Sequence, residues 1–131
     1  MTFLKVAILI SFLALWGCSS DELSVEYRDL AVPEELLASH EARSEGAKIF
    51  NGHCAICHGE NGNGQGMRRV LSSQPADLTD PIWRTRTSPE TVYRTIREGV
   101  PRTPMAGFKI FTIDETWSLV AYVWSLSERK G

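Results

Sequence analysis

Two cysteines and a histidine close together in the sequence, Cys54, Cys57 and His58, have the clearest chemical potential in this chain. Two thiols separated by two residues lie on one turn of the chain, so both can form thioethers with the vinyl groups of a haem. The histidine directly after the second cysteine can then present its imidazole to the iron. The sequence therefore predicts one haem, attached covalently at Cys54 and Cys57, with His58 as an iron ligand.

Other uses of these residues fit the sequence less well. A thioredoxin-like redox pair follows a strand and begins a helix, whereas an amphipathic helical pattern precedes Cys54. A structural zinc site needs four ligands around a tetrahedron, but His53, Cys54, Cys57 and His58 crowd on one segment. A disulfide between the two cysteines would close a small strained loop and would leave the adjacent histidine unexplained.

The group opposite His58 on the iron decides between electron transfer and catalysis, because a filled sixth position leaves no place for a substrate or oxygen. The candidates in the sequence are Met67, Met105, His40 and His53. Met105 follows Pro104, whose fixed backbone angle helps to preorganise a ligand loop. We expect Met105 to be the ligand, with Met67 next. A thioether favours reduced iron and predicts a higher potential than a second histidine would give.

Helices are predicted to position these residues. A first helix is expected from about residue 43 to residue 53, where apolar residues recur at helical spacing. A second is expected to begin after Ser88, which can cap the free amides, and to end at Gly99. A last helix is expected to begin with a capping box of Thr112 and Glu115 and to continue to about residue 126. No segment shows the alternation of a strand, so the sequence predicts an all-α domain over residues 45–131.

A glycine-rich segment, residues 59–66, follows the cysteine motif directly. It contains too much glycine for a regular helix or strand and is expected to form a loop. Because glycine has no side chain beyond hydrogen, we expect the backbone of this loop to pass close to a flat ligand.

The N-terminus is predicted to be a targeting segment. Lys5 is followed by an apolar stretch too short to span a bilayer comfortably, so residues 1–17 are expected to be a signal peptide. The stretch ends in Leu15-Trp16-Gly17-Cys18, which resembles a bacterial lipobox, and Cys18 is therefore expected to be lipidated. The alternatives are an uncleaved anchor helix and an ordinary signal peptide that is cleaved elsewhere.

Residues 18–44 carry more acidic than basic side chains and are expected to form an extended linker between membrane and domain. An ordered extension that packs on the domain is the alternative. The whole chain has a formal net charge of −2, which gives no basic excess for binding nucleic acid.

The chain resembles the class I c-type cytochromes from about residue 45 to residue 129. These features are Gly46 and Phe50, the motif at residues 54–59, the segment Thr103-Pro104-Met105, and the final helix around residues 119–123. It is similar to the cytochrome domains of haem-copper oxidase subunits. The resemblance implies the class I cytochrome c fold, one covalent haem c with His58 and Met105 as axial ligands, and an aromatic of the last helix packed near Gly46. It also implies that residues 75–78 line the haem edge, and a plain proline turn before Leu78 is the alternative.

The resemblance implies a one-electron carrier rather than an enzyme, with no small-molecule substrate. Its redox partners are expected to be a terminal oxidase or a quinol-oxidising complex, reached at the periplasmic side of a bacterial membrane through the N-terminal lipid anchor. Two alternatives remain: a haem-containing electron-entry subunit of a larger oxidoreductase complex, and a haem enzyme or gas sensor with a labile sixth ligand.

Overall fold

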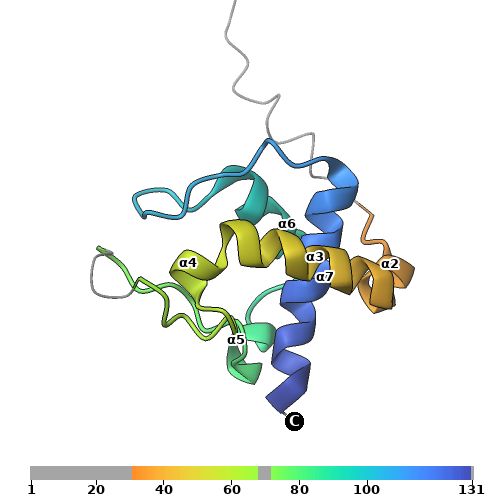
Figure 1. Ribbon diagram of the computed structural model, residues 1–131, viewed down its shortest axis with the longest axis horizontal. Helices are drawn as coiled ribbons and strands as arrows, with labels where there is room; N and C mark the ends of the chain where they lie inside the picture. Colours follow the sequence, from red (N-terminus) through yellow and green to blue (C-terminus); the bar gives the residue numbers. More distant parts are fainter. Residues whose placement is uncertain (1–30, 68–71, 131) are drawn as a thin grey trace, which may run out of the picture.

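A computed structural model describes residues 31–67 and 72–130 of the chain. These residues form helices joined by loops (Figure 1). The elements are α2 (Glu34–Ala38), α3 (His40–His53), α4 (Ala55–His58), α5 (Pro81–Thr85), α6 (Pro89–Glu98), α7 (Ile113–Leu126) and the 3-10 helix η1 (Ser127–Lys130). The described ranges contain no strand, apart from an isolated bridge between Gly99 and Ala106. The all-α prediction is confirmed.

The long helices α3 and α7 cross at Gly46 and form the centre of the fold (Figure 1). A Cβ atom on this glycine would lie 2.0 Å from the backbone oxygen of Ser118 and 2.8 Å from the Cβ atom of Tyr122. Phe50, one turn further along α3, is 1% exposed, and its ring centroid lies 5.2 Å from that of Tyr122. Gly46 thus lets two helices meet backbone to backbone, with an aromatic of the last helix beside it as expected.

We expect Gly46→Ala to lower the free energy of unfolding by about 1–3 kcal/mol, because the added methyl group forces the two helices apart. Gly52→Ala on the same helix is the matched control, since a Cβ atom there would meet nothing within 4 Å. Its higher helix propensity should raise stability by up to about 1 kcal/mol. Denaturant unfolding of the haem-loaded variants measures both values, and equal effects would contradict this account of the crossing.

The ends of α6 and α7 follow the predicted capping signals. Ser88 accepts a hydrogen bond from the backbone N–H of Thr91, and α6 ends at Gly99, whose φ is 77°. At the start of α7, the backbone N–H of Glu115 donates to the Thr112 hydroxyl (3.2 Å) and the N–H of Thr112 donates to the Glu115 carboxylate (2.8 Å). Both predicted helices are confirmed.

The packed helical unit begins earlier than the boundary expected at residue 45. Residues 34–44, assigned from the sequence to an acidic linker, form α2 and the first turn of α3. Leu37 is buried in the core, and its carbonyl accepts a hydrogen bond from Nε of Arg43 (2.9 Å). Ser39 caps α3 by accepting from the N–H of Ala42, which explains why the helix begins at His40. Residues 1–30, which include the predicted signal peptide and Cys18, lie outside the described residues.

The short helix α5 was not predicted, although Asp80 caps it and Pro81 occupies its first turn. Arg84 ties this helix to the C-terminal end of the fold. Its guanidinium lies 4.5 Å from the ring centroid of Trp124, donates to the Trp124 carbonyl (3.1 Å) and pairs with Glu128 (3.0 Å). Glu128 also pairs with Arg43 at 3.2 Å, so that α3, α5 and η1 are held together. Across the described part of the chain, no helix is both long and apolar enough to cross a membrane.

Candidate functional site

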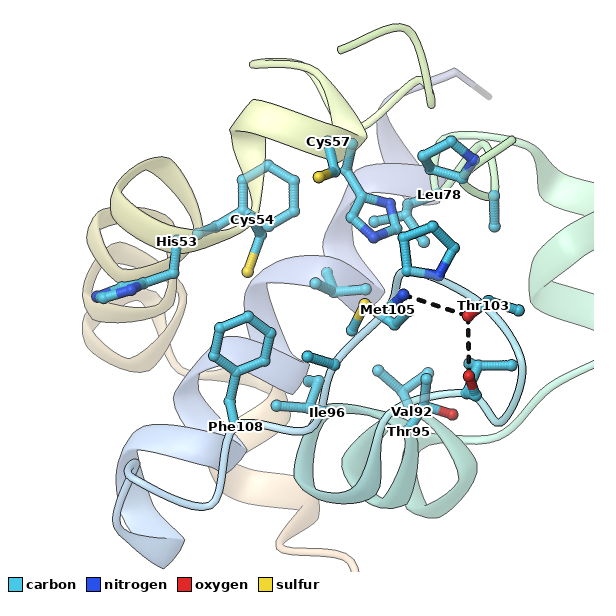
Figure 2. Close-up of a pocket in the computed structure, with 18 of the residues that line it drawn as sticks. His53, Cys54, Cys57, Leu78, Val92, Thr95, Ile96, Thr103, Met105 and Phe108 are labelled. Carbon is cyan, nitrogen blue, oxygen red and sulfur yellow. Dashed lines mark hydrogen bonds between the residues drawn. The ribbon is translucent and has the colours of Figure 1, made fainter. Parts of the chain in front are cut away.

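A cavity of about 330 Å³ lies between α3, α6 and α7 and the loops that join them. Its walls are mostly apolar and include side chains from α6 and α7, among them Val92, Ile96, Leu119 and Val123. Cys54, Cys57, His58 and Met105 all line this same cavity. Figure 2 shows that the two cysteines come from the helical segment at one side and that Met105 comes from a loop. The structure therefore brings together the four residues predicted to hold a haem.

One tight turn between α3 and α4 positions the two cysteines and the histidine. The N–H of Cys54 donates to the Phe50 carbonyl (2.8 Å), and the Cys54 carbonyl accepts from the N–H groups of Cys57 (3.1 Å) and His58 (2.9 Å). This turn follows a helix rather than a strand, unlike the thioredoxin-like arrangement, and no disulfide joins the two cysteines. Burial, together with the nearby Cys57, raises the pKa of the Cys54 thiol to about 11. The site favours an uncharged sulfur, and a thioether is uncharged.

The imidazole of His58 is also kept neutral. Burial lowers the pKa of this imidazole, and a hydrogen bond with the backbone of Ala76 raises it by a smaller amount. A neutral imidazole is the form that binds a metal ion. Mostly apolar walls, two cysteines on one turn and a buried imidazole that favours its neutral form fit a covalently bound haem.

The glycine-rich loop supports the motif instead of lining the cavity. A Cβ atom on Gly66 would lie 2.3 Å from the backbone oxygen of Ile56, so only glycine lets the chain approach there. The N–H of Gly64 donates to the His58 carbonyl (2.8 Å). None of residues 59–66 is among the cavity-lining residues. The prediction that this backbone passes close to a flat ligand was therefore wrong. Gly66 fits against the backbone of the motif, Gly64 against the backbone of residues 75–76, and Gly62 against the side chain of Leu126.

Met105 is held at the cavity by residues 99–106, which we call the methionine loop. The loop is closed at its base by the bridge between Gly99 and Ala106 and by a hydrogen bond from the N–H of Val100 to the Met105 carbonyl (2.9 Å). The Met105 side chain is half-buried. Met105 follows α6 in the sequence, whereas His58 lies more than thirty residues before that helix begins. Separate parts of the sequence therefore contribute to one site.

The other candidates for the sixth position are placed differently. Met67 is 43% exposed, and neither it nor His40, which is exposed at the start of α3, lines the cavity. His53 does line the cavity, but its ring packs edge-on against Phe111, at a centroid distance of 5.2 Å, and also against Phe108. Figure 2 shows the His53 ring at the outer side, turned away from Met105. The geometry therefore favours Met105 among the candidates.

The remaining cavity wall was only partly predicted. Pro75, Ala76 and Leu78 line the cavity, as the resemblance implied. Four polar residues in loops, Ser73, Gln74, Thr87 and Thr103, also line it. None of them was assigned to the cavity from the sequence, because short polar side chains in loops carry no distinctive sequence signal. None of the described arginines lines the cavity.

Direct metal binding by clustered side chains is the remaining sequence alternative. Among residues 31–67 and 72–130, the structure shows no group of three or more histidine, cysteine, aspartate or glutamate side chains that could hold a metal ion.

The chain matches known cytochromes over most of its length. The cytochrome c family model matches residues 44–127. The FixP subunit of the cbb3-type cytochrome c oxidase of Azorhizobium caulinodans is 43% identical over 58 residues. That match covers 44% of this chain but only 18% of FixP. The similarity to a cytochrome domain of an oxidase subunit, implied by the sequence motifs, is confirmed.

Solved structures support the same assignment. The c-type cytochrome KustC0563 matches with a TM-score of 0.53 and 32% identity, over 62% of this chain and 95% of that one. The reducing HAO-like protein complex Kustc0457/Kustc0458 of Kuenenia stuttgartiensis matches with a TM-score of 0.55 and 31% identity, over 66% of this chain and 43% of that chain. These findings explain why the cavity suits a covalent haem c, and the chain belongs to the cytochrome c family.

Proposed function

We propose that this protein is a one-electron carrier whose haem c is attached through Cys54 and Cys57, with His58 and Met105 as axial ligands. The observation that carries the proposal is that His58 and Met105 line one cavity from separate elements. When bound, the haem iron accepts and releases one electron by cycling between Fe(III) and Fe(II). If His58 and Met105 both bind the iron, the chain would leave no position on it for a substrate.

The chain supplies the environment for this electron. The apolar walls give the site a low dielectric. Burying a charged group there costs free energy, so the site favours the less charged state of the haem iron. The thioether of Met105 stabilises the reduced iron more than an imidazole would. Backbone hydrogen bonds of the turn at residues 54–58 and of the methionine loop hold His58 and Met105 in position.

An absorption spectrum of the holoprotein tests the ligand set. We expect the ferric protein to show the methionine–iron charge-transfer band toward the red end of the spectrum, and the reduced protein to bind carbon monoxide slowly. Stopped-flow mixing with a small reductant should show a single one-electron step. Absence of the band together with rapid carbon monoxide binding would contradict the proposal and favour a haem enzyme or gas sensor with a labile sixth ligand.

A second candidate is a haem-containing electron-entry subunit of a larger oxidoreductase complex. FixP is named as an oxidase subunit, and this chain spans about a fifth of its length. Gentle extraction followed by affinity purification separates the two cases, because a subunit should co-purify with its complex and a mobile carrier should not. In either case we propose redox proteins as partners, in particular a terminal oxidase or a quinol-oxidising complex.

We also propose that the protein is exported and works at the periplasmic side of a bacterial membrane, anchored by lipidation of Cys18. Two sequence features support this location: the apolar N-terminal segment after Lys5 and the lipobox-like residues before Cys18. Mass spectrometry of the mature N-terminus provides the test. A chain that begins at an acylated Cys18 supports the anchor, whereas one that begins further along or keeps Met1 without a lipid contradicts it.

A further inference from the structure

The methionine loop has few backbone groups with which to hold its shape. Pro101 and Pro104 have no N–H group, so neither can donate a hydrogen bond. The stretch from Val100 to Met105 contains two backbone hydrogen bonds. The N–H of Val100 donates to the Met105 carbonyl (2.9 Å), and the N–H of Thr103 donates to the Val100 carbonyl (3.2 Å). The shape of the loop therefore depends on its side chains.

The turn that begins this stretch also includes an unfavourable backbone conformation. Arg102 has a φ of 63°, in the left-handed region that favours glycine. Pro101 at the second position, a positive φ at Arg102 in the third, and the bond from Thr103 back to Val100 are typical of a type II turn. A residue with a Cβ atom stays in this conformation only where neighbouring contacts hold it there.

The hydroxyl of Thr103 makes contacts of this kind on both sides. It donates to the Val100 carbonyl (2.9 Å) and accepts from the backbone N–H of Met105 (3.2 Å), as the dashed lines in Figure 2 show. One hydroxyl thus joins the start of the turn to the residue that carries the thioether. Thr103 itself lines the cavity beside Met105.

We propose that Thr103 is a positioning residue that holds Met105 against the iron, a role that rests on the methionine ligation proposed above. Without the hydroxyl, the N–H of Met105 and the Val100 carbonyl each lose a partner, and the loop detaches from the iron more often. An external ligand can bind the iron only while the loop is detached, so its binding rate reports how well Met105 is held.

The test compares Thr103→Val with Thr103→Ser in the haem-loaded protein. Valine keeps the branched shape and removes the hydroxyl, whereas serine keeps the hydroxyl. Carbon monoxide should bind reduced Thr103→Val about tenfold faster than wild type, the factor expected for the net loss of one to two hydrogen bonds. Thr103→Ser should bind at a rate close to wild type, and Thr103→Ala, a second variant without the hydroxyl, should behave like valine.

Thr85→Val is the matched control, because the Thr85 hydroxyl also donates to a backbone carbonyl at 2.9 Å, that of Ile82, but lies outside the cavity wall. It should leave the carbon monoxide rate unchanged. Wild-type rates in both Thr103→Val and Thr103→Ala, in a protein that shows the methionine–iron band, would overturn the role of Thr103 alone. A serine variant as fast as valine would overturn it as well. A wild-type protein without the band would overturn the ligation and this role together.

Discussion

Replacing both Cys54 and Cys57 with alanine is expected to produce a chain that loses its haem completely when it is denatured. The thioethers would be the only covalent links between the chain and the cofactor, and the iron–ligand bonds do not survive denaturation. On a denaturing gel stained for haem, the double variant should give no signal, and its mass should be that of the polypeptide alone. Each single variant should keep the haem through the remaining thioether.

Cys18→Ser is the matched control, because Cys18 is the third cysteine of the chain and has no proposed role in haem attachment. It should keep a full haem signal even if its membrane attachment is lost. A double variant that still carries covalent haem would refute the assignment of Cys54 and Cys57. The expected effect is all or none, since it depends on whether a covalent bond can form.

Met105→Leu is expected to open the sixth position of the iron. Leucine is similar in volume but has no sulfur, so the cavity stays filled while the ligand is lost. The methionine–iron band should disappear and reduced protein should bind carbon monoxide rapidly. The reduction potential should fall by roughly 100 mV or more, within the range of about 0.8 V that axial ligands span.

Met67→Leu makes the same substitution at the other methionine considered as a ligand. Met67 does not line the cavity, so this variant should keep the band, the slow carbon monoxide binding and the potential of the wild type. The reverse result, in which Met67→Leu loses the band and Met105→Leu keeps it, would assign the ligand to Met67. Redox titration followed by absorption measures the potentials of both variants.

Local signals predicted much of this fold from the sequence. The capping pairs at Ser88 and at Thr112 with Glu115 identified where α6 and α7 begin, because the free amides of a helix start need such partners nearby in the sequence. The cysteine motif placed one side of the site for a similar reason. Cys54, Cys57 and His58 lie on a single turn, so their spacing in the sequence already fixes how close they are in the fold.

Contacts between distant residues were harder to predict. Charge bias suggested an extended linker up to residue 44, but residues 34–44 are helical and Leu37 among them is buried in the core. The glycines after the motif suggested contact with a ligand, whereas Gly66 is needed for contact with the backbone of Ile56. In both cases the composition of the segment did not indicate which other part of the chain it contacts. Those contacts form only in the folded protein.

The backbone crossing of α3 and α7 has a consequence for the speed of electron transfer. A donor and an acceptor exchange an electron quickly when the surrounding atoms need to move little, that is, when the reorganisation energy is small. The cavity wall includes Phe50 of α3 and Leu119 and Val123 of α7, and these two helices are locked together at Gly46. Closely packed interiors resist compression, so we expect this frame to change little when the iron of the proposed haem is oxidised or reduced.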